Sequence, residues 1–236
     1  MSLILGIETA TKMCSVAISK DGELLSIKEI GGEYSHSENL NYFIELVCTE
    51  AKITLKQLDA VAVSKGPGSY TGLRIGVSSA KGLCYGVDIP LIAVDTLKAL
   101  STSVMSSSFF MNNVGKDFLL CPMIDARRME VYTSLYNTRL ELVESISAKI
   151  IDENSFSNKL DTCKVVFFGD GAEKCKALLN NHPNAVFVDN VEPSANYINQ
   201  LAAEKFNNQQ FEDVAYFEPY YLKEFLATTP KNKIQG

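Results

Sequence analysis

The amino-acid sequence predicts an α/β protein made of two similar halves, and two observations support this prediction. First, short apolar runs of strand length alternate with segments whose apolar residues recur at helical spacing. Second, the order β-β-β-α-β-α-β-α occurs twice with matching landmarks. An acid follows the first strand of each half (Glu8 and Asp125), and glycines follow the fourth strand (66–68 and 169–171). The chain is therefore expected to contain a duplicated unit.

The first half is expected over residues 1–105. Its second and third strands are joined at Asp21-Gly22, a dipeptide typical of tight hairpins. Apolar residues from Leu40 to Ala51 recur at the spacing of an amphipathic helix. Strands are expected at 3–7, 14–19, 23–30, 60–64 and 91–94, and helices at 37–51, 70–85 and from residue 96 onward.

The second half is expected over residues 114–212, after a polar segment at 101–113 that fits a domain boundary. Residues 213–236 are expected to pack back on the body of the protein. Strands are expected at 118–124, 130–136, 140–147, 165–168 and 185–188, and helices near 153–159, from 171 to 179 and at 195–206.

The composition is typical of a soluble globular protein, with 46% hydrophobic and 21% charged residues. The net charge is −6, and neither half is basic: residues 1–110 carry 9 lysines and arginines against 11 acids, and residues 111–236 carry 13 against 17. Because affinity for nucleic acid depends on basic side chains, we expect the chain to contact RNA only through a partner.

The sequence does not favour a membrane protein, a disulfide-bonded protein or a metalloenzyme. No segment has the roughly 18 apolar residues that a membrane span needs, and the N-terminus lacks the features of a signal peptide. The 6 cysteines show no Cys-x-x-Cys pair, which is typical of reduced thiols in a cytoplasmic protein. The chain has 2 histidines, His36 and His182, and no cluster with metal-ligand spacing.

The most unusual stretch runs from Gly66 to Leu83, between a buried strand and a helix. Its glycine-rich turn favours an anion site at a helix N-terminus, but the Gly-Lys-Ser/Thr of a P-loop is missing. Within the helix, Gly72, Gly76 and Ala80 leave one face almost without side chains. Each internal glycine costs roughly 0.5–1 kcal/mol relative to alanine, so close packing of another element is the alternative interpretation. The sequence leaves both open.

A duplicated β₃αβαβα unit is the layout of the actin-like, sugar-kinase and Hsp70 ATPase (ASKHA) fold. In that fold nucleotide lies between the halves, with its phosphates over the loop after the first strand, here residues 8–13. This loop lacks the glycine that would let its backbone approach a phosphate, and fold alone is weak evidence for function. The hypothesis of a vestigial nucleotide site concerns Glu8, Thr9, Thr11 and Asp125.

The stretch Gly66–Leu83 closely resembles the signature of the TsaB (YeaZ) family, and the resemblance extends over nearly the whole chain. Residues Ile4–Ala10 resemble the family's N-terminus, and His36–Glu38 its helix entry. Asp125–Tyr132 resembles the family's Asp-Ala-Arg hairpin, and Pro219–Leu222 its closing motif. The resemblance implies an ASKHA fold and a function in bacterial synthesis of tRNA threonylcarbamoyladenosine (t6A).

In that pathway TsaB is the non-catalytic partner of TsaD, which transfers a threonylcarbamoyl group to N6 of adenosine 37. The resemblance therefore implies a scaffold subunit that forms a heterodimer with TsaD and recruits the ATPase TsaE. A homodimer is expected when the chain is isolated, because exposed apolar helices favour self-association. Contact with tRNA only through the complex and a cytoplasmic location are expected from the charge and the cysteines. This chain alone is expected to require no cofactor, while ATP or ADP would bind at an interface of the complex.

The catalytic relative TsaD holds its metal with two histidines, four residues apart, just after the fifth strand of the first half. The matching positions here are Thr96 and Leu100, and neither side chain ligates a metal as imidazole does. We therefore expect an inactive homologue without catalytic or metal-binding residues. The alternative is an independent ATPase or small-molecule kinase of the same fold. A peptidase is excluded, because the chain has no His-Glu-x-x-His and no glycine-flanked serine nucleophile.

Helices 37–51 and 70–85 are the expected partner interface, because both carry apolar residues on more than one side. Two such helices from each partner would form a four-helix contact. The residues assigned to this interface are Tyr42, Leu46, Tyr70, Leu73, Arg74, Gly76 and Val77.

Overall fold

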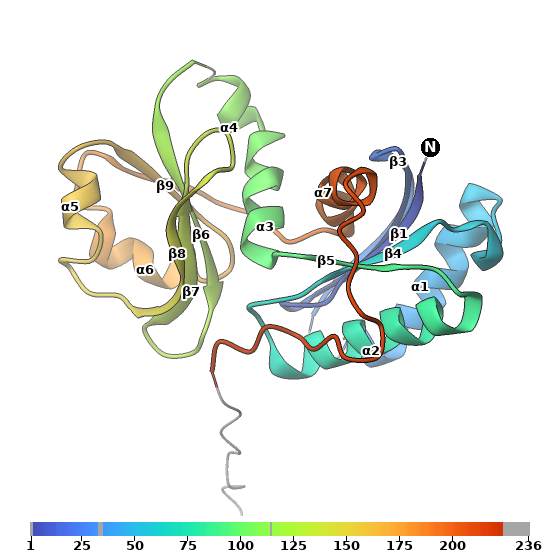
Figure 1. Ribbon diagram of the computed structural model, residues 1–236. Helices are drawn as coiled ribbons and strands as arrows, with labels where there is room; N and C mark the ends of the chain where they lie inside the picture. The colour runs from blue at the N-terminus through green and yellow to red at the C-terminus, as the bar shows by residue number, and fades with distance from the viewer. Residues whose placement is uncertain (1, 33–34, 114, 224–236) are drawn as a thin grey trace, which may run out of the picture.

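A computed structural model describes residues 2–32, 35–113 and 115–223. It contains two five-stranded sheets, ordered β3-β2-β1-β4-β5 and β10-β9-β6-β7-β8. Read from the opposite edge, the second order is the first one repeated, so the structure confirms the duplicated unit. Figure 1 shows the two sheets side by side, separated by the helices α3 and α7.

The first sheet joins an antiparallel part to a parallel part. β1 pairs antiparallel with β2 and parallel with β4, with Gly6 opposite Ala17 and Ala62. Asp21 and Gly22 both have positive φ, as the predicted β2–β3 hairpin requires. The elements are β1 (Leu3–Glu8), β2 (Met13–Lys20), β3 (Glu23–Gly31), α1 (Ser35–Ala51), the 3₁₀ turn η1 (Leu55–Gln57), β4 (Ala60–Ser64), α2 (Tyr70–Val87), β5 (Leu91–Val94) and α3 (Thr96–Met105).

The second sheet has the same plan. β6 pairs antiparallel with β7 and parallel with β9. The weak helix expected near 153–159 is a single turn at 157–160, and the third strand is shifted from 140–147 to 142–150. The elements are α4 (Ser108–Met111), β6 (Phe118–Asp125), β7 (Glu130–Tyr136), β8 (Leu142–Ile150), α5 (Ser157–Leu160), β9 (Lys164–Phe168), α6 (Ala172–Leu179), β10 (Ala185–Val188) and α7 (Ala195–Asn207).

The helix that ends each half covers the sheet of the other half. On the face of the first sheet opposite α1 and α2, Ile4 and Ala62 pack against Ile198 of α7. On the second sheet, Leu120 and Phe168 pack against residues of α3. α3 and α7 thus lie between the sheets (Figure 1), and neither half completes its core without a helix from the other. This exchange modifies the expected division into subdomains 1–105 and 114–212.

The polar segment at 101–113, which was expected to hold the domain boundary, is helical and buried over its first part, while the expected end of the first half at residue 105 coincides with the end of α3. Ser101, Thr102 and Ser103 belong to α3 and are almost fully buried. Their hydroxyls are satisfied within the helix: Ser101 Oγ donates to the carbonyl of Leu97 at 2.8 Å, and Thr102 Oγ1 to that of Lys98 at 2.9 Å. The boundary begins only after Met105.

No helix within the described ranges is both long and apolar enough to cross a lipid bilayer.

Candidate functional site: the α1/α2 face and the closed phosphate loop

The loop after β1, where the fold would place a phosphate, is bonded to the start of α2. Thr9 Oγ1 donates to the carbonyl of Gly72 at 2.8 Å, and the amide of Ser69 donates to the carbonyl of Ala10 at 2.6 Å. On its other side, Nε2 of His36 donates to the carbonyl of Thr11 at 2.8 Å. Thr9 and Thr11 are buried. The hydroxyl expected to donate to a phosphate is therefore already used by the protein itself.

The glycines at the start of α2 allow the close contact between this helix and the loop after β1. A Cβ on Gly68 would lie 2.3 Å from the carbonyl oxygen of Ala10, and one on Gly72 would lie 2.1 Å from that of Thr9. A Cβ on Gly76 would lie 2.2 Å from Thr9 Oγ1. Only glycine lets the helix approach the loop this closely. Of the two interpretations left open by the sequence, these contacts support close packing of α2 against the loop.

Glu8 is fully buried beneath the same loop. Its Oε1 accepts hydrogen bonds from the amide of Ala10 at 2.6 Å and from Ser64 Oγ at 3.0 Å, while Oε2 is buried without a partner among the described residues. Burial raises the pKa of this carboxyl to about 7. Glu8 therefore holds the loop in place through hydrogen bonds. Because side chains alternate along a strand, it lies on the same face of β1 as Ile4 and Gly6, the face that packs against α7.

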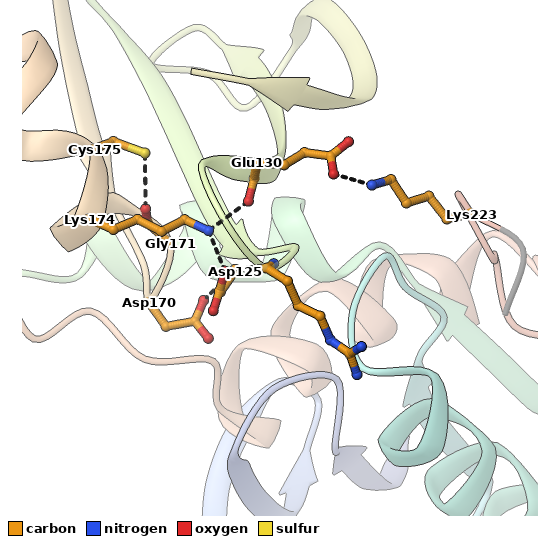
Figure 2. A network of polar contacts seen from close by, with 8 residues as sticks. Asp125, Glu130, Asp170, Gly171, Lys174, Cys175 and Lys223 are labelled. Atoms are coloured by element: carbon orange, nitrogen blue, oxygen red, sulfur yellow. Dashed lines mark hydrogen bonds and ion pairs between the residues drawn. The ribbon is translucent and has the colours of Figure 1, made fainter. Parts of the chain in front are cut away.

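Asp125, the fourth residue of the vestigial-site hypothesis, belongs to a separate network in the second half (Figure 2). It forms an ion pair with Lys174, whose Nζ also donates to the carbonyl of Glu130. Asp170 accepts a hydrogen bond from the amide of Asp125 at 3.0 Å, and burial raises the pKa of Asp170. The structure thus uses Asp125 to join the β6–β7 hairpin to α6, apart from Glu8, Thr9 and Thr11.

Part of the predicted partner interface is corrected by the burial of its residues. Leu73 and Val77 are 1% and 4% exposed and face the chain's own core, and Gly76 faces Thr9. These three residues pack between α2 and the rest of the chain, so they are not accessible to a partner. The sequence did not indicate which side of α2 faces inward, because apolar residues lie nearly all round this helix.

The outward side of α2 is formed instead by small residues that sequence reasoning missed. Ser78, Gly82 and Gly86 are exposed, and a Cβ on Gly82 or Gly86 would meet no atom within 4 Å. No contact with another described residue explains these two glycines. Tyr85, 87% exposed, lies on the same side. The signal available in the sequence was the second series of small residues, 78, 82 and 86, offset from the series 72, 76 and 80.

The remaining predicted interface residues border this surface. Tyr42 of α1 is 56% exposed, and Leu46 is partly exposed at the contact of α1 with the core. Arg74 lies over the ring of Tyr70, 4.5 Å from its centroid, and the ring of Tyr221 packs on Tyr70 at 4.8 Å. We call the exposed surface formed by Tyr42, Leu46, Ser78, Gly82, Tyr85 and Gly86 the docking face.

Comparison with known proteins places the chain in a family. The family model described as TsaD, tRNA N6-adenosine threonylcarbamoyltransferase, matches residues 32–231. The tRNA threonylcarbamoyladenosine biosynthesis protein TsaB of Haemophilus influenzae is 28% identical over 229 residues, 93% of either chain. TsaB of Buchnera aphidicola subsp. Schizaphis graminum is 32% identical over 178 residues, 74% of this chain and 81% of that protein. The chain belongs to the TsaB family.

The fold agrees with this assignment. The crystal structure of YeaZ from Pseudomonas aeruginosa matches 94% of this chain and all of its own length with a TM-score of 0.79, at 24% identity. This similarity shows the fold alone. Together with the duplicated topology, it confirms the expected ASKHA architecture of a TsaB protein.

In this TsaB chain Thr96 and Leu100, the two positions that the sequence resemblance matches to metal-binding histidines, have structural roles. Thr96 is fully buried, and its Oγ1 accepts a hydrogen bond from the amide of Gly66 at 3.1 Å. Leu100 is fully buried in the core that α3 forms with the second sheet. In the described part of the chain, no three His, Cys, Asp or Glu side chains come together as metal ligands would. Both positions are therefore committed to packing.

Proposed function

We propose that this chain is the non-catalytic dimerisation and scaffold subunit of a bacterial tRNA N6-adenosine (A37) threonylcarbamoyltransferase complex. It binds and activates TsaD through the docking face and recruits TsaE. The observation that carries the proposal is the outward side of α2, where a Cβ on Gly82 or Gly86 would meet no described atom within 4 Å and Tyr85 is 87% exposed. Tyr42 of α1, the helix that packs beside α2, is 56% exposed. Small residues on a helix allow another helix to approach closely, and exposed tyrosines supply contact area.

The relation between the two proteins supports this choice of partner. The model that matches residues 32–231 is that of the transferase itself, so a TsaD subunit contains counterparts of α1 and α2. Two homologous helix pairs can pack face to face about a pseudo-twofold axis, as in an isologous dimer. The same surface would join two copies of this chain when TsaD is absent, which gives the homodimer of the isolated protein.

The remaining parts of the proposal follow from the same assembly. This chain requires no cofactor by itself, a proposal supported by the hydrogen bond that Thr9 of the loop after β1 already makes to α2, and ATP or ADP binds at an interface of the complex. With a net charge of −6, the chain contacts tRNA only through its partners. The complex acts in the cytoplasm, where tRNA is modified.

The docking face is tested by enlarging its smallest residue. Gly82→Gln places a long polar side chain where the structure has open space, so the fold tolerates it while a partner helix cannot approach. We expect binding of the organism's own TsaD, measured by titration calorimetry, to weaken at least tenfold. The matched control is Ala177→Gln, on an exposed position of α6 in the second half, which should leave binding unchanged. Equal binding by both variants would contradict the proposal.

The alternative function, an independent ATPase or small-molecule kinase, is separated by two measurements. Isothermal titration of the isolated chain with Mg-ATP, together with ATP turnover, tests whether it acts alone. A t6A assay that omits each component in turn tests whether the complex needs it. Saturable turnover by the isolated chain would favour the alternative, and full t6A synthesis without this chain would overturn the scaffold function.

A further inference from the structure

The C-terminal residues 213–223, which we call the strap, run along α2 toward the second half (Figure 1). The amide of Glu212, just before the strap, donates to the carbonyl of Leu91 at 2.9 Å, beside the last strand of the first sheet. Farther on, the amide of Tyr220 donates to the carbonyl of Lys65 at 2.7 Å. Lys223 then forms an ion pair with Glu130 of β7 (Figure 2). The strap is therefore held at both ends and crosses the flank of α2 between them.

The middle of the strap is fixed by Lys81 of α2. Its Nζ donates to the carbonyl of Ala215 at 3.1 Å and to that of Phe217 at 2.9 Å. Val214 and Phe217 pack against the core of the first half, and Asp213 Oδ1 accepts hydrogen bonds from the amides of Ala215 and Tyr216. These inward contacts on both sides of Tyr216 turn its side chain outward, where it is 84% exposed.

The strap and the outward side of α2 are neighbours on the helix surface. At 3.6 residues per turn, Tyr70, Arg74 and Lys81, which all meet the strap, lie within roughly 40° of one another. The exposed residues Ser78, Gly82 and Tyr85 lie next to them and span roughly 60°. A partner helix lying on Gly82 would therefore have α1 with Tyr42 on one side and the strap with Tyr216 on the other.

We propose that the strap is the second wall of the docking face and that Tyr216 contacts the bound TsaD subunit directly. Lys81 acts as a positioning residue, because it holds the two carbonyls on either side of Tyr216. The occupant is the pair of first-half helices of TsaD, as in the function proposed above, on which this inference rests. An exposed tyrosine on a backbone held by hydrogen bonds, at the edge of a small-residue surface, is the kind of side chain that contributes strongly to an interface.

The first experiment measures TsaD binding by Tyr216→Ala and Tyr216→Phe, at concentrations where light scattering shows the unmixed chain to be monomeric. Tyr216→Ala removes the exposed ring without touching the strap's backbone contacts, and we expect affinity to fall about tenfold or more. Tyr216→Phe keeps the body of the ring and should bind within about threefold of the unaltered chain. Leu142→Ala, which removes another large exposed side chain (55% exposed) on β8 of the second half, is the control and should have no effect.

The second experiment tests the role of Lys81 through a double-mutant cycle. Lys81→Met frees the strap, so hydrogen exchange of residues 214–217 should accelerate and TsaD affinity should fall. Because Lys81 acts through Tyr216, adding Lys81→Met to Tyr216→Ala should weaken binding no further, within about twofold. Fully additive losses would show that Lys81 does not act through Tyr216.

The outcomes separate this inference from the proposed function. If Gly82→Gln weakens binding and Tyr216→Ala does not, the docking face stands and the strap is not its wall. If Tyr216→Ala strengthens binding, the strap is an obstacle that TsaD must displace, and the inference is overturned. If neither variant changes the binding of TsaD, the proposed docking face itself is wrong.

Discussion

The hydroxyl of Thr9 lies where a side chain on Gly76 would have to be. A Cβ at Gly76 would stand 2.2 Å from Thr9 Oγ1, and that hydroxyl is fixed by its hydrogen bond to the carbonyl of Gly72. We expect Gly76→Ala to destabilise the protein by about 2 kcal/mol through overpacking, measured by urea denaturation.

Gly82→Ala is the matched control in the same helix. A Cβ there meets nothing within 4 Å, so replacing glycine by alanine should stabilise the protein by about 0.5–1 kcal/mol. If Gly82→Ala lowered the stability as much as Gly76→Ala, then Gly82 would be as closely packed as Gly76, and the orientation of α2 in the structure would be wrong.

The stability of the protein should depend on the proton of Glu8. Burial raises the pKa of this carboxyl from 4.5 to about 7 in the folded state. Between these values the folded protein retains a proton that the unfolded chain has released, so the contribution of Glu8 is present below pH 4.5 and is lost as pH rises to 7. One pKa unit corresponds to about 1.4 kcal/mol, so the expected loss is on the order of 3 kcal/mol.

Glu8→Gln isolates this effect from other titrating groups. The amide oxygen can accept the hydrogen bonds from Ala10 and Ser64 that Oε1 accepts now, and it has no proton to lose. The difference in unfolding free energy between variant and unaltered chain should therefore shift in favour of the variant from pH 5 to pH 7.5. A difference that stays constant over this range would mean that Glu8 titrates in the ordinary range.

The attachment of α7 to the first sheet depends on Asn199. This buried side chain donates from Nδ2 to the carbonyls of Ile4 and Ala17, at 3.4 and 3.1 Å, and it packs closely on Gly6. Asn199→Ala leaves these carbonyls without that donor, and we expect a loss of about 2 kcal/mol in thermal or urea unfolding. The exposed neighbour Gln200 serves as control, since Gln200→Ala should change little.

Restoring the two histidines of the catalytic relative should not create a metal site. Thr96 and Leu100 are both fully buried in packing contacts, and losing a buried leucine costs about 2–5 kcal/mol. The double variant Thr96→His with Leu100→His should therefore unfold at a lower temperature, with or without added Zn²⁺ or Fe²⁺. Stabilisation of this variant by metal would show that the positions are more open than the structure has them.

The elements could be predicted from the sequence because their signals are local. The alternation of residues 14–19, the Asp21-Gly22 turn and the run 165–168 each specify a strand or a hairpin without reference to the rest of the chain. The repeated order of these elements was then enough to predict the fold. The buried serines of α3 affected only the predicted position of the boundary between the halves. Their hydroxyls bond to carbonyls of the helix itself, so a polar sequence can be buried there.

The candidate site was predicted less well, because its signals depend on tertiary contacts. α2 is apolar nearly all round, so periodicity could not tell whether Leu73 or Gly82 faces outward. The role of Thr9 depends on α2, which lies more than sixty residues away along the chain. Tyr216 has no periodic neighbours, and its direction is fixed by contacts of the residues around it with Lys81 and with the core of the first half.

Because α7 covers the inner face of the first sheet but is synthesised last, this face is left uncovered for part of the time that the ribosome takes to make the chain. The inner face of the first sheet, with Ile4, Ala62 and Ile92, is complete once β5 has left the ribosome, but Ile198 and Ala202 that cover it belong to α7. At usual rates of synthesis the intervening chain takes on the order of ten seconds. During that time an apolar sheet face is open to water and to chaperones. A transcript broken before Ala195 would leave this face permanently uncovered and its product prone to aggregation.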